Sequence, residues 1–171
     1  MRGSGCAADV TCYEKNGQQW EEVRQTSGVV GKNGISAESR EGDYRTPQGV
    51  FPLGFAFGTE AVEDLHLEYR LLNQQCYCVD DPESAYYNQW VESSTVQWNS
   101  AEHLADYPRA YHYAVVIGYN LDPVVPYAGS AIFLHCQTGN YTAGCVAVPE
   151  EDMLWILRWL DAEKHPQIMI N

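Results

Sequence analysis

The chain has 171 residues, which is enough for one domain with a sizeable hydrophobic core. It carries 23 acidic and 10 basic residues, a net charge of −13, and contains no basic stretch that would neutralise phosphates, so we expect no nucleic-acid partner. No run of about eighteen or more apolar residues occurs, so the sequence predicts no membrane-spanning helix.

The first residues differ in character from the rest of the chain. Residues 1–5 are typical of a leader added for expression, so we expect a single domain over residues 7–171. We also expect the natural protein to be an exported one whose signal or anchor is missing from this sequence.

The amino-terminal third reads as strands separated by glycine-rich turns. Alternating apolar residues predict strands over 9–14 and 20–23, joined at Asn16-Gly17, a pair typical of tight hairpin turns. An irregular segment rich in glycine and proline follows. It leads into an apolar strand predicted over 50–57.

The middle of the chain gives weaker signals. Residues 61–72 alternate in a way that suits a strand, although their composition also allows a helix, and the sequence predicts a strand over 69–79. Residues 80–108 are polar and aromatic without clear periodicity. A segment this long is usually functional or a packed flap, and we expect it to contain short helices.

The carboxy-terminal part predicts further strands over 111–119, 131–136 and 167–170. One long helix is predicted over about 149–164, because its proline and acidic residues suit the first turn and its apolar residues recur with helical spacing. These elements together predict a mainly β domain.

A histidine and a cysteine stand close together near the end of the chain. His135 ends an apolar run, and Cys145 follows a short polar turn, directly behind Gly144. A thiol with an ordinary pKa of about 8.5 is mostly protonated at neutral pH and needs an imidazole or a dipole to become a thiolate. His135 is the candidate base, and the amides of Gly144 and Cys145 are candidates for stabilising an oxyanion. An inert buried cysteine is the alternative.

The remaining cysteines allow two structural interpretations. In an exported protein, Cys76 or Cys78 would form a disulfide with Cys6 or Cys12. Alternatively, Cys76 and Cys78 are two buried thiols on one face of a strand. A single residue between them is too few for a structural zinc site, and we expect no metal ion.

The pattern of His135, a linker and Thr142-Ala143-Gly144-Cys145 resembles the signature of L,D-transpeptidases with a YkuD-like catalytic domain, in a branch with Thr-Ala-Gly-Cys in place of Ser-His-Gly-Cys. Other blocks resemble the same branch, namely residues 31–35, 40–43, 46–53, 79–82, 87–90 and 117–120. The resemblance covers almost the whole chain. It implies a β-sandwich or half-barrel of mixed sheets, with residues 80–108 as a flap over the cleft.

The resemblance also implies roles for individual residues. Cys145 looks like the nucleophile, His135 like the base, the carbonyl of Cys136 like the group that orients the imidazole, and the amide of Gly144 like an oxyanion donor. Substrate contacts are expected from Tyr119, Asn120, Thr142, Ala143 and His112. The usual histidine before Gly-Cys is replaced here by Ala143, so backbone amides or other segments must supply its contribution.

The resemblance implies that the protein is a peptidoglycan L,D-transpeptidase that forms cross-links through a cysteine thioester. Its partners would be donor and acceptor stem peptides, and it would need neither cofactor nor metal. We expect a monomer that acts outside the cytoplasm, in the cell wall or periplasm. One alternative is an L,D-carboxypeptidase that uses water as the acceptor, and another is a non-catalytic wall-binding module.

Overall fold

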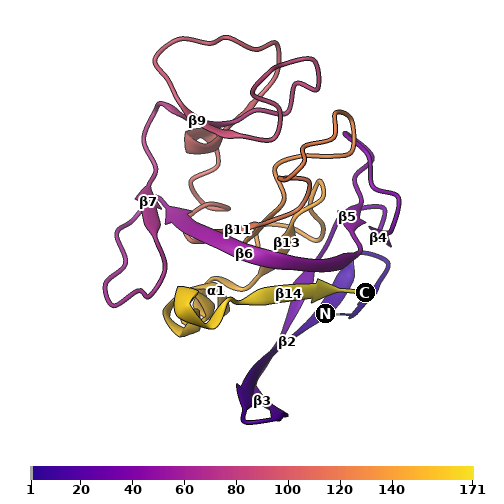
Figure 1. Ribbon diagram of the computed structural model, residues 1–171, viewed down its shortest axis with the longest axis vertical. Helices are drawn as coiled ribbons and strands as arrows, with labels where there is room; N and C mark the ends of the chain where they lie inside the picture. Colours follow the sequence, from indigo (N-terminus) through magenta and orange to yellow (C-terminus); the bar gives the residue numbers. More distant parts are fainter. Residues whose placement is uncertain (1) are drawn as a thin grey trace.

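A computed structural model describes residues 2–171 (Figure 1). The main sheet has nine strands in the order β1-β2-β3-β13-β12-β11-β6-β14, with β7 paired to β6. Their bounds are Arg2–Ser4 (β1), Ala7–Asn16 (β2), Gln19–Val29 (β3), Gly49–Gly58 (β6), Tyr69–Leu71 (β7), Ala114–Ile117 (β11), Phe133–Cys136 (β12), Val146–Val148 (β13) and Gln167–Ile170 (β14). Strand pairs β12–β13 and β6–β7 are parallel, so the sheet is mixed.

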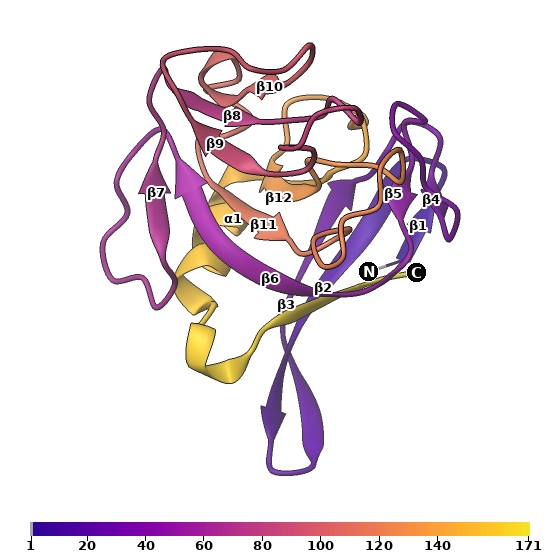
Figure 2. The same cartoon turned by 45° about the horizontal axis from the view of Figure 1, so that its top comes forward.

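Two smaller sheets flank the main one. Strands β8 (Cys76–Cys78), β9 (Trp90–Glu92) and β10 (Glu102–His103) form a sheet in the order β10-β8-β9, followed by the 3₁₀ turn η1 (Leu104–Asp106). Strands β4 (Ile35–Ser36) and β5 (Thr46–Pro47) form a parallel pair. In Figure 2 the three-stranded sheet lies at the top, and the outer part of the β2–β3 hairpin projects from the bottom.

The amino-terminal hairpin is confirmed, with longer strands than predicted. Strands β2 and β3 pair from Ala7↔Val29 to Asn16↔Gln19, which leaves Gly17 and Gln18 as the loop. Gly17 adopts a φ of +62°, a conformation that glycine tolerates because it lacks a Cβ. Residues 2–4, which we expected to be a leader outside the domain, pair with β2 as strand β1.

The single strand predicted over 69–79 is wrong, because its two ends belong to different sheets. Strand β7 pairs with β6, whereas β8 joins the three-stranded sheet. A turn at Asn73 separates them, since the Asn73 side chain accepts a hydrogen bond from the Gln75 amide at 2.7 Å and its carbonyl accepts one from the Cys76 amide at 3.2 Å. An asparagine that bonds its own backbone two residues on favours such a turn.

The carboxy-terminal helix is shorter than predicted. Helix α1 spans Glu150–Trp159, and it is the only α-helix among residues 2–171. Leu160 is extended, with φ −65° and ψ 138°, although its amide still closes the last turn on Ile156. The Asp161 side chain then accepts a hydrogen bond from the Glu163 amide and begins a separate 3₁₀ turn, η2 (Ala162–Lys164).

Several other boundaries also differ from those predicted. Strands β11 and β12 cover only the central parts of 111–119 and 131–136, and Asn120 and Ala131 adopt positive φ values of 52° and 53° beyond them. Residues 80–108 contain two short strands and one 3₁₀ turn. The mainly β fold with mixed sheets and one helix near the carboxy terminus is confirmed.

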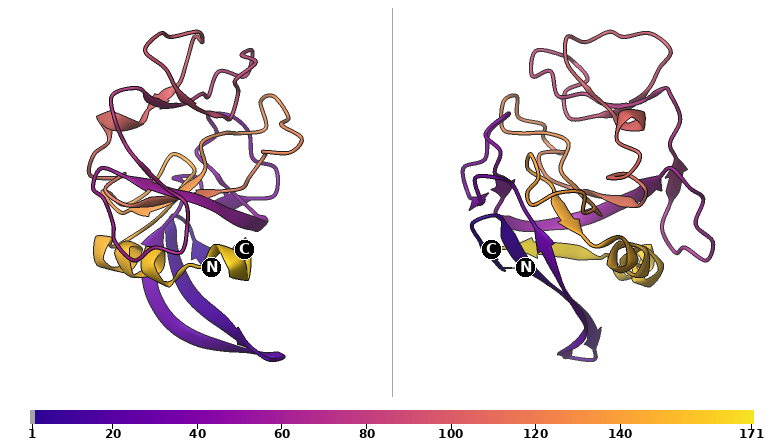
Figure 3. Two further views of the ribbon diagram at one scale, coloured as in Figure 1. Left: turned by 60° about the vertical axis from the view of Figure 1, so that its left-hand side comes forward. Right: turned by 180° about the vertical axis from the view of Figure 1, so that it is seen from behind.

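The main sheet separates two clusters of buried side chains. Helix α1 packs against one face, where Leu134 and Cys136 of β12 join Val146 and Val148 of β13. Phe133 of β12 faces the other side, in a cluster with Cys145 and the two cysteines of β8. Figure 3 shows α1 and the loops of residues 80–108 on opposite sides of β6. Alternation along β12 therefore points His135 away from the helix.

All six cysteines of the chain are free. Cys76 and Cys78 are buried on one face of β8, whereas Tyr77 between them is only partly buried. The cysteines of β8 and Cys12 belong to different clusters, which agrees with the alternative of buried thiols rather than a disulfide. Among residues 2–171, no helix is long and apolar enough to cross a membrane.

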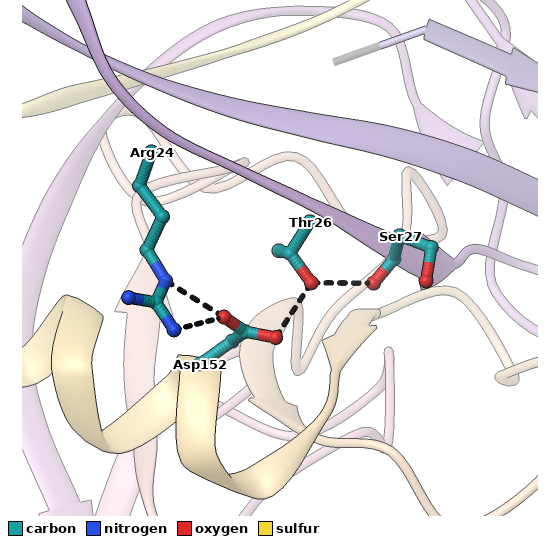
Figure 4. A network of polar contacts seen from close by, with 4 residues as sticks. All are labelled: Arg24, Thr26, Ser27 and Asp152. Carbon is teal, nitrogen blue, oxygen red and sulfur yellow. Dashed lines mark hydrogen bonds and ion pairs between the residues drawn. The ribbon is translucent and has the colours of Figure 1, made fainter.

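A partly buried ion pair connects the hairpin to the helix (Figure 4). Two guanidinium nitrogens of Arg24 lie 2.7 and 2.6 Å from one carboxylate oxygen of Asp152, and the Thr26 hydroxyl donates to the other oxygen at 2.6 Å. Asp152 stands in the first turn of α1 and is 7% exposed. Both oxygens of the Asp152 carboxylate thus have partners on β3, and these contacts hold the helix against the main sheet.

Candidate active site

A cleft of about 400 Å³ opens on the side of the main sheet opposite α1. One wall is the loop of residues 39–45, and another comes from Asp80, Glu102 and Tyr111. The floor contains residues 129–132 and 142–145, with His135 beside them. Cys145 and His135 therefore line the same cleft.

The parallel pairing of β12 with β13 places these two side chains on the same face. Leu134 pairs with Val146 and His135 with Ala147. One residue earlier in the same register, Cys145 lies beside Phe133, which shares its face of the strand with His135. The Cys145 thiol donates to the Ala131 carbonyl at 3.2 Å, and its sulfur accepts from the Phe133 amide at 3.3 Å. Among residues 2–171, no hydrogen bond joins Cys145 to His135.

The imidazole of His135 is oriented by its own strand. Its Nδ1 lies 2.9 Å from the carbonyl oxygen of Cys136. A carbonyl only accepts hydrogen bonds, so Nδ1 carries the proton and Nε2 of the neutral ring has a free lone pair. Burial lowers the pKa of His135, and the Cys136 carbonyl opposes this only in part. The ring is therefore a neutral base at neutral pH.

The Cys145 thiol is protonated in the free protein. Burial raises its pKa, the nearby Glu102 carboxylate adds to this effect, and only the Phe133 amide opposes it. A buried thiol beside a carboxylate loses its proton only when a base accepts it. The site therefore suits a nucleophile that is deprotonated during the reaction, rather than a preformed thiolate-imidazolium pair.

Two threonines hold the backbone of Cys145. Its carbonyl accepts from the hydroxyls of Thr142 at 2.6 Å and Thr46 at 3.2 Å, and the Thr46 oxygen accepts from the Gly31 amide at 2.8 Å. The Gly144 amide donates to the Thr142 hydroxyl at 3.1 Å, whereas the Cys145 amide has no acceptor among residues 2–171. The Cys145 amide is thus a free donor at this turn.

The glycine at position 144 is explained by close packing. A Cβ there would lie 3.1 Å from the Arg45 carbonyl oxygen and 3.3 Å from a methyl carbon of Ile132. The loop of residues 39–45 thus lies directly against the Gly144-Cys145 backbone. A larger residue would push apart two walls of the cleft.

A family model described as the L,D-transpeptidase catalytic domain, YkuD, matches residues 8–166. The chain belongs to the YkuD family. No curated protein and no solved structure matches it. Membership supports a cysteine-dependent enzyme of the L,D-transpeptidase type that acts on peptidoglycan, and hence outside the cytoplasm.

Two of the five expected substrate contacts of this YkuD domain lie in the cleft. Thr142 and Ala143 line it. Tyr119 lies outside, where its hydroxyl donates to the Ala128 carbonyl at 2.5 Å. The Asn120 side chain bonds the backbone of Val125 and Gly129 and thereby shapes the loop before β12.

His112, the fifth expected contact, also lies outside the cleft. Its ring nitrogens stand 3.3 Å from a Glu60 carboxylate oxygen and 3.2 Å from one of Glu150. Burial lowers the pKa of His112, but the hydrogen bonds that its ring donates to Glu150 and Glu60 outweigh burial, so the pKa is raised overall. The His112 ring therefore links α1 to the loop after β6, and it does so most strongly when it is protonated.

This linkage predicts a pH-dependent stability. A raised folded pKa means that His112 contributes its full stabilisation below the unfolded pKa of about 6.5 and loses it as the pH rises through the folded pKa. We expect His112→Gln to lower the free energy of unfolding at pH 5.5 by up to about 1 kcal/mol and by less at pH 9. Urea unfolding of both proteins at the two pH values measures this, and equal losses would contradict it.

Sequence reasoning missed Asn88, which supports the floor of the cleft. Its side-chain nitrogen donates to the carbonyls of Tyr119 and Asn120 at 3.0 and 2.7 Å, and its side-chain oxygen accepts from the Ala131 amide at 3.0 Å. Ala131 is the residue whose carbonyl accepts from the Cys145 thiol. Asn88 stands in one of the blocks that resemble the family, which is the signal that marks it.

Residues 80–108 contribute three side chains to the cleft, those of Asp80, Glu102 and Tyr107. Trp98 lies elsewhere, where it packs against Tyr77 and Tyr86. Trp90 also lies outside the cleft, where it packs against Phe55 and Phe57 of β6.

Proposed function

We propose that this YkuD domain is a peptidoglycan L,D-transpeptidase that cross-links stem peptides through a Cys145 thioester. The supporting observation is that His135 of β12 and Cys145, which directly precedes β13, line one cleft, with a neutral imidazole whose Nε2 is free to accept a proton. Family membership supplies the substrate class.

In the first half-reaction, His135 takes the proton of the Cys145 thiol. The sulfur attacks the carbonyl carbon of the L-configured residue in a tetrapeptide stem, and the Cys145 amide donates to the oxyanion. The C–N bond then breaks, the terminal D-amino acid leaves with the proton from His135, and a thioester remains.

In the second half-reaction, the side-chain amine of a neighbouring stem attacks the thioester. A C–N bond forms, the C–S bond breaks and the sulfur is reprotonated through His135. Water in place of the amine gives a tripeptide, the carboxypeptidase outcome. We propose that residues 80–108 act as a flap and that the protein works as a monomer in the cell wall or periplasm.

The test is incubation of the protein with purified disaccharide-tetrapeptide, followed by mass analysis of the products. A cross-linked dimer is expected. Tripeptide alone would replace the proposal with a carboxypeptidase, and unchanged substrate would favour a wall-binding module. Cys6→Ser is the matched control, because it removes a thiol outside the cleft.

A further inference from the structure

A partly buried carboxylate lies in the cleft wall, and the mechanism above does not use it. Glu102 of β10 lines the cleft together with Cys145 and His135, and its carboxylate accepts from the Tyr111 hydroxyl. The Tyr111 ring in turn packs edge-on against the His135 imidazole, with 5.5 Å between ring centroids. One tyrosine thus touches both the candidate base and the Glu102 carboxylate.

Asp80 stands beside Glu102 in the same wall. Its oxygen Oδ1 is buried and has no hydrogen-bond partner among residues 2–171. Burying an unpaired carboxylate oxygen is costly, so the wall favours a positively charged or donating group. No lysine or arginine forms an ion pair with Asp80 or Glu102 among the described residues.

The transfer step requires the removal of two protons from its acceptor. An amine at neutral pH is an ammonium ion, which has no lone pair and cannot attack a thioester. One proton must leave before attack, and a second leaves the nitrogen as the amide forms. His135 has only one free nitrogen and accepts one proton.

We propose that Glu102 is a further catalytic residue, whose carboxylate binds the acceptor ammonium and takes the first of these two protons. This inference rests on the proposed function. The ammonium gives one proton to Glu102, which becomes a neutral carboxylic acid. The amine nitrogen bonds to the thioester carbon, the C–S bond breaks, and His135 transfers the second proton to the Cys145 sulfur. Glu102 then releases its proton to solvent.

The electrostatic surroundings of Glu102 suit this role. Burial raises its pKa to about 7, with the charge of Asp80 adding to the rise and the Tyr111 hydroxyl opposing it. The thiols of Cys78 and Cys145 also face it, and the Glu102 charge raises the pKa of both. A general base is most effective when its pKa lies near the working pH.

Glu102→Gln tests the proposal, with disaccharide-tetrapeptide as both donor and acceptor at pH 8. We expect the ratio of dimer to tripeptide to fall at least about tenfold, because hydrolysis needs no ammonium deprotonation. The defect should shrink as the pH approaches that at which free amines are neutral, about 10. Alkylation of Cys145 by iodoacetamide should become faster, because the charge that raises the thiol pKa is gone.

Glu92→Gln is the matched control, since Glu92 is exposed on strand β9 of the same three-stranded sheet and lies outside the cleft. Tyr111→Phe provides a second variant that retains the carboxylate. Loss of the hydroxyl raises the pKa of Glu102, so the pH at which the dimer-to-tripeptide ratio rises should shift upward.

An unchanged dimer-to-tripeptide ratio in Glu102→Gln would overturn the assignment, as would parallel losses of dimer and tripeptide at every pH. Absence of a Cys145 acyl-enzyme in the unaltered protein would instead overturn the proposed function, and this inference with it. The two failures are therefore distinguishable by the mass of the intact protein.

Discussion

Cys145→Ser lowers the rate of product formation from disaccharide-tetrapeptide by at least about 10³-fold. A serine hydroxyl is a much weaker acid than a thiol, and a neutral imidazole of lowered pKa does not ionise it readily. The fold should be unaffected, because the hydroxyl retains both neighbours of the sulfur, the Ala131 carbonyl and the Phe133 amide.

Initial rates and urea unfolding curves of the two proteins measure this prediction. We expect the free energies of unfolding to agree within about 1 kcal/mol, so that lost activity reports on chemistry. Turnover of Cys145→Ser at the rate of the unaltered protein would remove Cys145 from the mechanism.

We expect the largest change in stability from Asp152→Ala, which should lower the free energy of unfolding by about 3 kcal/mol. The substitution leaves the Arg24 guanidinium and the Thr26 hydroxyl without the carboxylate that joins β3 to α1. Arg24 is about one-third exposed, with a side-chain exposure of 32%, so water compensates part of the loss.

Chemical denaturation followed by circular dichroism checks this value. Glu151→Ala is the matched control, since Glu151 is an exposed carboxylate in the same helical turn, and we expect it to change the free energy of unfolding by about 0.5 kcal/mol or less. Similar losses in the free energy of unfolding in both variants would contradict the prediction. They would show that Asp152 stabilises the protein only as a negative charge near the helix amino terminus, and not through the ion pair with Arg24.

Local patterns predicted much of this fold. The hairpin follows from alternation around Gly17, and β6 follows from an apolar run bounded by glycine and proline. Helix α1 begins where three acidic residues follow Pro149. In each case the residues that predict the element lie within it. The sequence therefore predicted each element correctly, although the ends of the elements differ from those predicted.

Features set by contacts distant in sequence were missed. Residues 69–79 divide between two sheets because of partners in β6 and β9, which local alternation does not reveal. The sequence predicts a surface carboxylate at Glu102, in a polar segment, yet the fold places Glu102 in the cleft wall against Tyr111. Thr46 reaches the Cys145 carbonyl from 99 positions away in the sequence.

The candidate site shows the same division. The motif predicted that Cys145 and His135 lie together, and both line the cleft because the parallel pairing of β12 and β13 keeps them on one face. Tyr119 and Asn120 were included because their block resembles the family, and His112 because it lies on the strand predicted before that of His135. The side chains of all three have partners elsewhere.

The most direct test of the account is to trap the acyl-enzyme. The protein is mixed with disaccharide-tetrapeptide, quenched in acid within the first turnover, digested and analysed by mass spectrometry. We expect the peptide containing Cys145 to gain the mass of the disaccharide-tripeptide acyl group and to lose it with hydroxylamine, as a thioester does. Products that form while Cys145 remains unmodified, or an adduct confined to another residue, would contradict the assignment of Cys145 as the nucleophile.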